Sequence, residues 1–365
     1  MKLIIDARYT RTDYHDGISR YTASLIDALK NLVDTKHPEV PAGFELVMAI
    51  SDPAQLKMLP DVPHVKICSP TGSLELLAAR QLNKFSPDVV FSPMQTIGSV
   101  GRKFKLLLTL HDLIYYDYPT PPSFLPMTVR WGWRAFHTSF EPQRKLLNRA
   151  DAVVTVSQTT AAQIAEHKLT KRPVHIVPNA PQPGSIIGAD TAIERAERRT
   201  KHLLYMGSFM PYKGVETLVE AMKLLPDYQL HLLSKINSAD HMHLSALAGA
   251  NVTFHNGVDE SDYRHMLSSA AALLTASRAE GYGLPVVEAL AAGCPVVISD
   301  IPIFREIAPH AFFAAADQPE DFAQHVRWLE DTDIQSTQVL NGLEDAAAYS
   351  WQNSALTLLR VIKDL

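Results

Sequence analysis

The sequence predicts an α/β protein made of two Rossmann-like domains in tandem. Short runs of β-branched residues and leucine alternate with longer helical patterns, and these runs are hydrophobic at nearly every position. A single stretch rich in proline and glycine, between residues 178 and 200, interrupts the series. Uninterrupted hydrophobicity is typical of parallel strands that helices cover on both faces. A chain of 365 residues is long enough for two such domains.

The expected strands fall into two series, one on each side of the interruption. They comprise residues 2–6, 45–50, 65–68, 88–92, 105–110, 152–157 and 174–177 in the first series, and 202–206, 228–233, 251–255, 271–276, 295–299 and 311–316 in the second. We expect a first domain at residues 1–180 and a second at 181–350. Residues 351–365 carry Leu356, Leu359 and Ile362 at helical spacing, which predicts a helix that packs back on the first domain.

Composition and charge exclude several classes of protein. With 46% hydrophobic and 20% charged residues the chain is typical of an ordinary folded protein, and a formal net charge of -5 argues against a nucleic-acid scaffold. The sequence contains no run of eighteen uncharged apolar residues, so it predicts no membrane span. Cys68 and Cys294 form no CxxC pair, so neither a disulfide framework nor a zinc site is indicated. We expect a cytoplasmic protein, with peripheral contact at the inner face of a membrane left open.

The segment that most strongly indicates a ligand-binding site is TASRAEGYGLPVVEALAAGCPVVIS, at residues 275–299. A strand is expected to end near Ala276, a loop to pass through Gly281 and Gly283, and a helix to begin at Pro285, because proline suits the first helical position. The free amide groups of residues 281–284, together with the positive end of the helix dipole, would form a binding site for a diphosphate.

Glu280 and Glu288 lie on either side of this predicted anion site. Glu280 belongs to the loop and Glu288 lies about one turn inside the helix. Two carboxylates cannot both bind phosphate oxygens, because like charges repel, but each can accept hydrogen bonds from hydroxyl groups. The pattern therefore predicts one glutamate for a sugar and one for a ribose.

The run EGYGLPVVE at 280–288 resembles the E-x7-E signature of family 4 retaining glycosyltransferases, which have the GT-B fold with two Rossmann-like domains facing across a cleft. The resemblance implies that Glu280 contacts the transferred sugar and Glu288 the nucleotide ribose. LLTLHDL at 107–113 is similar to a strand-end motif that places His111 beside the sugar. GSFMPYKGVETLVEAM at 207–222 is similar to the donor-phosphate loop and implies that Lys213 binds the phosphates.

The N-terminal segment IIDARYTRTDYHDGISRYTASLIDAL resembles the glycine loop and first helix of mannosyltransferase-like members, with Gly17 at the loop position. The catalytic residues so implied are Glu280, His111 and Lys213. The donor-binding residues so implied are Gly17, Ser208, Gly281, Tyr282, Gly283, Leu284 and Glu288. Many members have an arginine where this chain has Ser208, so Lys213 would be the cation of that loop, with help from Arg278 or Arg20.

The resemblance implies retaining transfer of a hexose, mannose from GDP-mannose, to a hydroxyl of a saccharide or lipid-linked saccharide. It implies neither a metal nor another cofactor, and no protein nucleophile, since the leaving phosphate takes the acceptor proton. Two alternatives remain: a nucleotide-sugar epimerase, and a non-catalytic protein that binds nucleotide sugars on the same fold. The acceptor and the oligomeric state stay open.

Simpler interpretations accompany several of these residues. His111 by itself favours a capped structural histidine, and Gly17 can serve a tight turn alone. His241 and His243 lie two residues apart, so they point to different sides and favour no metal site. Cys294 is expected to be a buried, inert thiol. The stretch Phe124–Phe140 favours an ordinary core helix over an acceptor groove or a membrane-contacting surface.

Overall fold

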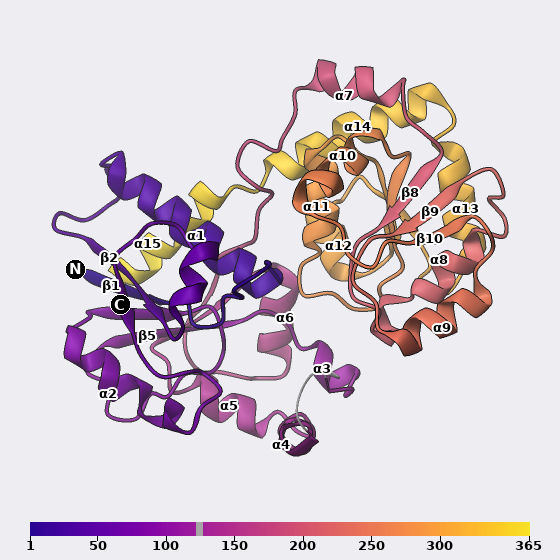
Figure 1. Ribbon diagram of the computed structural model, residues 1–365. Helices are drawn as coiled ribbons and strands as arrows, with labels where there is room; N and C mark the ends of the chain where they lie inside the picture. The colour runs from indigo at the N-terminus through magenta and orange to yellow at the C-terminus, as the bar shows by residue number, and fades with distance from the viewer. Residues whose placement is uncertain (122–126) are drawn as a thin grey trace. The chain divides into compact units, whose positions relative to one another are not determined.

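The computed structural model describes residues 1–121 and 127–365, and their contacts divide the chain into two compact units. The first unit comprises Met1–Asn179 together with Ser350–Leu365, and the second comprises Ala180–Tyr349. Each unit is a parallel sheet with helices packed around it (Figure 1). The predicted strands are all present, and their ends differ from the predicted ends by at most two residues. The predicted pair of Rossmann-like α/β folds is therefore confirmed.

The first unit has a seven-stranded sheet in the order β3-β2-β1-β4-β5-β6-β7. Its strands are β1 (Lys2–Asp6), β2 (Glu45–Ile50), β3 (His64–Lys66), β4 (Val89–Ser92), β5 (Lys105–Leu110), β6 (Ala152–Thr155) and β7 (Val174–Ile176). The order reverses between the neighbouring strands β1 and β4. Ligands of open parallel sheets bind where such a reversal separates the loops at the carboxyl ends of the strands.

The helices of the first unit connect these strands. They are α1 (Gly17–Asp34), η1 (Pro53–Met58), η2 (Ser73–Leu77), α2 (Ala78–Leu82), η3 (Asn83–Phe85), α3 (Ile114–Asp117), α4 (Met127–Phe136), α5 (Glu141–Leu147), α6 (Gln158–Glu166) and α15 (Trp351–Lys363). Helix α1 begins where it does because the side chain of Asp16 accepts a hydrogen bond from the amide of Ser19.

The C-terminal helix α15 packs on the first unit, beside α1, as predicted (Figure 1). The Ser354 hydroxyl donates to the carbonyl of Pro178 at 2.8 Å, and the Trp351 ring lies 5.8 Å from the ring of Tyr21. Leu359 and Ile362 are buried as predicted, but Leu358 is buried where Leu356 was expected, and Leu356 is only half-buried.

The second unit has a six-stranded sheet in the order β10-β9-β8-β11-β12-β13, which reverses between β8 and β11. Its strands are β8 (His202–Tyr205), β9 (Gln229–Leu232), β10 (Val252–Phe254), β11 (Ala272–Thr275), β12 (Val296–Ser299) and β13 (Phe312–Ala314). Its helices are α7 (Ala189–Ala196), η4 (Pro211–Lys213), α8 (Val215–Ala221), α9 (Ser238–Leu247), α10 (Glu260–Ser269), α11 (Leu284–Ala291), α12 (Pro302–Ile307), α13 (Pro319–Trp328) and α14 (Thr332–Ala347).

The loops that follow β8 and β11 approach each other closely at Gly214. This glycine joins η4 to α8 with φ of +60°, in the left-handed region. A Cβ atom there would lie 2.4 Å from the carbonyl oxygen of Ala276, which directly follows β11. Only glycine satisfies both constraints, so the contact between the two loops depends on this position.

We therefore expect Gly214→Ala to lower the free energy of unfolding by at least about 2 kcal/mol, because it adds left-handed strain to an overpacked contact. Urea denaturation followed by circular dichroism measures this change. Gly188→Ala is the matched control in the same unit, since a Cβ atom there meets nothing within 4 Å and should cost less than about 1 kcal/mol. Equal stabilities of the two variants would contradict the prediction.

Candidate active site

Lys213 and Glu280 form an ion pair at the carboxyl edge of the second sheet. Lys213 Nζ lies 2.6 Å from Glu280 Oε1, and each side chain is 14% exposed. Lys213 ends η4 in the loop after β8, whereas Glu280 lies in the loop after β11. The pair therefore joins the two loops on either side of the strand-order reversal. The sequence motifs predicted separate roles for these two residues and no contact between them.

Buried hydroxyl groups behind Glu280 fix its position. Ser277 Oγ donates to Glu280 Oε1 at 2.8 Å and lies 3.0 Å from Thr275 Oγ1, while the Ser299 hydroxyl donates to the carbonyl of Ser277. The hydrogen bonds from Ser277 and Lys213 to Glu280 both use Oε1, and neither uses Oε2. Ser277 could not be identified from the sequence, because a lone serine after a strand forms no motif. Its only signal is its place three residues before the glutamate.

Helix α11 begins at Leu284, one residue before the predicted start, so Pro285 is its second residue. Gly283 precedes it with φ of +99°, and a Cβ atom there would lie 2.7 Å from the Phe304 ring. Glycine has no side chain with which to cap the helix, and no side-chain hydrogen bond caps this N-terminus. Pro285 has no amide hydrogen, and the amides of Val286 and Val287 donate to the carbonyl of Gly283 at 2.9 and 3.4 Å. The helix therefore offers an anion the positive end of its dipole and the amide of Leu284, together with the loop that precedes it.

The other predicted donor-binding residues around the start of α11 differ in how exposed they are. Gly281 and Leu284 are half-buried, and Glu288 lies one turn inside α11, also half-buried. The side chain of Tyr282 is 5% exposed and its ring lies 6.0 Å from the Tyr349 ring. Only the backbone of Tyr282 is therefore available to a ligand at this edge.

Ser208 is exposed in the loop after β8, and its carbonyl accepts a hydrogen bond from the Tyr205 hydroxyl at 2.5 Å. The exposed side chain of Arg278, from the loop after β11, reaches the same region. Arg278 Nη1 donates to the carbonyl of Pro211 at 3.3 Å, and its amide donates to the carbonyl of Tyr212 at 2.7 Å. Arg278 and Arg20 were the two arginines expected to supply the charge that many family members have at position 208. Arg278 lies beside η4, whereas Arg20 belongs to the first unit.

His111 follows β5 in the first unit and is held by backbone groups. Its Nε2 donates to the carbonyl of Pro93 at 2.8 Å, and its ring lies edge-on to the Tyr21 ring at 5.2 Å. Burial lowers the pKa of His111 below its ordinary value. The neutral ring therefore carries its proton on Nε2, and Nδ1 is its acceptor nitrogen.

Gly17 is the first residue of α1 and lies outside the left-handed region. A Cβ atom at Gly17 would meet nothing within 4 Å. Neither the backbone conformation nor the packing around Gly17 therefore requires a glycine, and its role in donor binding stays a prediction. Space beside the backbone remains for a ligand.

The two histidines and the cysteine that were predicted to have structural roles lie in separate surroundings. His241 lies 4.6 Å from the Phe254 ring, whereas His243 Nε2 lies 3.5 Å from Glu216 Oε1, so the two imidazoles have different partners. Within residues 1–121 and 127–365, no three His, Cys, Asp or Glu side chains gather around one point. Burial raises the pKa of the Cys294 thiol to about 11, which keeps it protonated.

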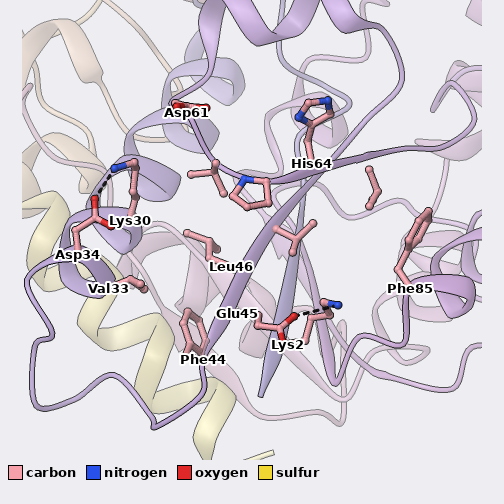
Figure 2. A pocket seen from close by; sticks show the side chains of 14 residues that line it. Lys2, Lys30, Val33, Asp34, Phe44, Glu45, Leu46, Asp61, His64 and Phe85 are labelled. Atoms are coloured by element: carbon pink, nitrogen blue, oxygen red, sulfur yellow. Dashed lines mark hydrogen bonds and ion pairs between the residues drawn. The ribbon is translucent and has the colours of Figure 1, made fainter.

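A hollow of about 520 Å³ lies at the opposite edge of the first sheet, near the amino ends of β1 and β2 (Figure 2). Its walls are mainly apolar, and the ion pairs Lys2–Glu45 and Lys30–Asp34 flank it. Because parallel sheets bind ligands at the carboxyl ends of their strands, this hollow is separate from the candidate site.

Comparison with known proteins identifies the family. Residues 15–181 match the model described as Glycosyltransferase Family 4, and residues 189–341 match the model described as Glycosyl transferases group 1. The chain is a family 4 glycosyltransferase. It is therefore an enzyme, of the hexosyltransferase class.

Relatives in sequence include several bacterial mannosyltransferases. The O-antigen chain mannosyltransferase RfbU of Salmonella typhimurium is 25% identical over 70% of this chain and 68% of its own length. The MMP alpha-(1->4)-mannosyltransferase of Mycolicibacterium hassiacum is 25% identical over 71% of this chain and 65% of its own. The serotype-specific mannosyltransferase WbdA of Escherichia coli is 27% identical over 59% of this chain, but that match spans only 29% of WbdA.

Solved structures share the fold of this glycosyltransferase. Sucrose-phosphate synthase from Thermosynechococcus elongatus superposes with a TM-score of 0.75 at 20% identity, covering 100% of this chain and 98% of that one. Anabaena HepE in complex with UDP-glucose gives a TM-score of 0.72 at 16% identity, covering 100% of both chains. These neighbours confirm the predicted GT-B fold. In the part of the chain that the structure describes, no helix has the length and apolar character needed to cross a membrane.

The burial of His111 predicts the pH range in which its imidazole titrates. We expect its ring resonances in an NMR titration to change at a pH below the ordinary histidine value of about 6.5, because burial disfavours the charged imidazolium. Since the folded-state pKa is lowered, the stability contributed by neutral His111 is fully present above the unfolded pKa and falls as the pH drops below it. A titration midpoint at or above the ordinary value would contradict this placement.

Proposed function

We propose that this glycosyltransferase transfers a hexose, mannose from GDP-mannose, to a hydroxyl of a saccharide or lipid-linked saccharide with retention of anomeric configuration. The observation that carries the proposed donor site is the Lys213–Glu280 pair in front of the uncapped N-terminus of α11. A cation, a carboxylate and a set of amide groups at one sheet edge match the diphosphate and the hydroxyl groups of a nucleotide sugar.

The charges of Lys213 and Glu280 determine how the diphosphate of a donor would bind at this sheet edge. A diphosphate bound at the first turn of α11 brings negative charge near Glu280, and Lys213 is the cation that offsets the repulsion between them. Negative charge grows on the diphosphate as the glycosyl bond breaks, so amide groups and a cation aimed at it stabilise the transition state more than the ground state. No metal is needed for this step in the proposed mechanism.

The remaining groups have roles that the resemblance to the family implies, and the hydrogen bonds of Glu280 and His111 fit these roles. Glu280, held by Ser277 through Oε1, would accept a hydrogen bond from a hydroxyl of the transferred sugar. Glu288 would accept hydrogen bonds from the ribose hydroxyls. His111 would accept a hydrogen bond from the sugar through Nδ1, since Nε2 is bonded to Pro93. The leaving phosphate oxygen would take the acceptor proton, so that no protein nucleophile is assigned.

The choice of donor sugar rests on sequence relatives. RfbU, WbdA and the Mycolicibacterium enzyme are named as mannosyltransferases, whereas the UDP-glucose complex belongs to a neighbour that resembles this chain in fold alone. Incubation with GDP-, UDP- and ADP-sugars, with and without chelator, tests the donor through its slow hydrolysis. Turnover of UDP- or ADP-sugars alone would overturn GDP-mannose, and conversion of the donor to another sugar nucleotide without an acceptor would indicate an epimerase.

Glu280→Gln is expected to lower transfer by roughly a hundredfold or more, because the neutral amide is a weaker acceptor and no longer holds Lys213. Nucleoside diphosphate affinity, measured by calorimetry, should stay within a few fold. Glu220→Gln, an exposed acid on α8, is the control and should leave both quantities unchanged. Transfer at the wild-type rate by Glu280→Gln would remove Glu280 from the active site.

Lys213→Ala is expected to weaken GDP binding about ten- to a hundredfold while changing guanosine binding little, since a charge-assisted hydrogen bond to phosphate contributes about 1.5–3 kcal/mol. Lys223→Ala supplies a surface control. The double variant Lys213→Ala/Glu280→Gln separates two explanations for the loss. GDP affinity restored in the double variant would show that Lys213 only neutralises Glu280, and the proposed phosphate contact would be wrong.

A further inference from the structure

Positive charge is concentrated on one flank of the first unit. Between residues 127 and 172, eight Lys and Arg residues stand against three Asp and Glu residues, whereas the whole chain has a formal net charge of -5. One of the three acids, Asp151, is paired with Arg102 at 2.7 Å, and another, Glu141, lies 3.4 Å from Arg144. The exposed cations of this basic flank are Arg134, Lys145, Arg149, Lys168, Lys171 and Arg172.

Contacts join the elements that carry these cations. Arg144 on α5 donates to the carbonyls of His167 and Lys168, which follow α6, and Arg172 donates to the carbonyl of Asn148, which follows α5. The Phe140 ring stacks on the His167 ring at 4.3 Å. These contacts join helices α5 and α6 and the segment before β7 into one surface.

Helix α4 extends this surface with apolar side chains that face away from the protein. Its inner face is fixed by Trp133, whose ring lies 4.8 Å from the Tyr115 ring. Met127 is 74% exposed and Trp131 is 70% exposed, and their spacing of four residues places them on one side of the helix, with exposed Arg134 beside them. The expected core helix is thus only half correct, and residues 124–126 of the predicted stretch lie outside the described residues.

From this charge distribution and the exposed face of α4 we propose that the basic flank and α4 dock on an anionic lipid surface. Lysine and arginine are attracted to the negative potential of such a surface, and exposed tryptophan and methionine insert at its interface. The apolar residues lie on α4, at one end of the cationic area. A typical protein interface instead has its apolar residues at the centre and polar residues at the rim. This proposal is independent of the donor assignment.

The test is flotation of the full chain with vesicles of phosphatidylcholine alone and of an equal mixture of phosphatidylcholine and phosphatidylglycerol. We expect binding to the mixture only, with loss at high salt, since the attraction is electrostatic. The triple variant Lys168→Glu/Lys171→Glu/Arg172→Glu should bind on the order of a hundredfold more weakly, at about fivefold for each basic residue removed. Trp131→Ala should bind more weakly and should lose the blue shift of tryptophan fluorescence.

Matched controls isolate the surface from net charge and folding. The triple variant Arg198→Glu/Lys223→Glu/Arg264→Glu changes exposed cations of the second unit by the same total charge and should bind vesicles like the parent. Trp328→Ala, 43% exposed on α13, serves the same purpose for Trp131. An unchanged far-ultraviolet circular dichroism spectrum of every variant shows that the fold is intact. Equal weakening by both triple variants, equal binding to neutral vesicles, or binding to the soluble polyanion heparin without binding to vesicles would overturn the proposal.

Discussion

The ion pair between Lys213 and Glu280 is the interaction on which the candidate active site depends. It joins two loops that leave neighbouring strands β8 and β11, and it forms because Gly214 lets the backbone approach Ala276. Both side chains are largely buried, so removal of either partner leaves a charge that water solvates poorly. In the proposed donor site, the cation that holds Glu280 would also be the cation that binds the diphosphate. Donor binding and the position of Glu280 would then be coupled.

The first unit has a comparable charged connection at its own strand-order reversal. Arg8, two residues beyond the end of β1, binds Asp6 through Nε at 2.7 Å and Glu75 of η2 through Nη1 at 2.5 Å. The amide of Gly98 donates to Glu75 Oε1 at 3.1 Å, and a Cβ atom at Gly98 would collide with the carbonyl of Glu75. In each unit, then, a largely buried cation and a glycine hold the loops at the sheet edge where ligands bind in this class of fold.

The sequence was sufficient for the fold, because buried parallel strands leave a continuous hydrophobic run that local inspection detects. It was less exact where glycine geometry decides, as at the start of α11, where the left-handed Gly283 admits Leu284 as the first helical residue. The pair of Lys213 and Glu280 spans 67 residues, and no local pattern encodes such a contact. Ser277 was missed for the same reason, since its hydrogen bond to Glu280 becomes visible only in three dimensions.

The substitution of Ser208 for the arginine of many family members has a structural counterpart. Arg278 comes from the loop after β11 and places its guanidinium against the carbonyl of Pro211, in the loop where that arginine would otherwise stand. A cation delivered from the β11 loop adds to the field around Lys213 while leaving the carbonyl of Ser208 bonded to Tyr205. Since electrostatic attraction depends on the position of a charge and not on the segment that supplies it, Arg278 would contribute to the proposed anion site the charge that an arginine at position 208 would otherwise supply.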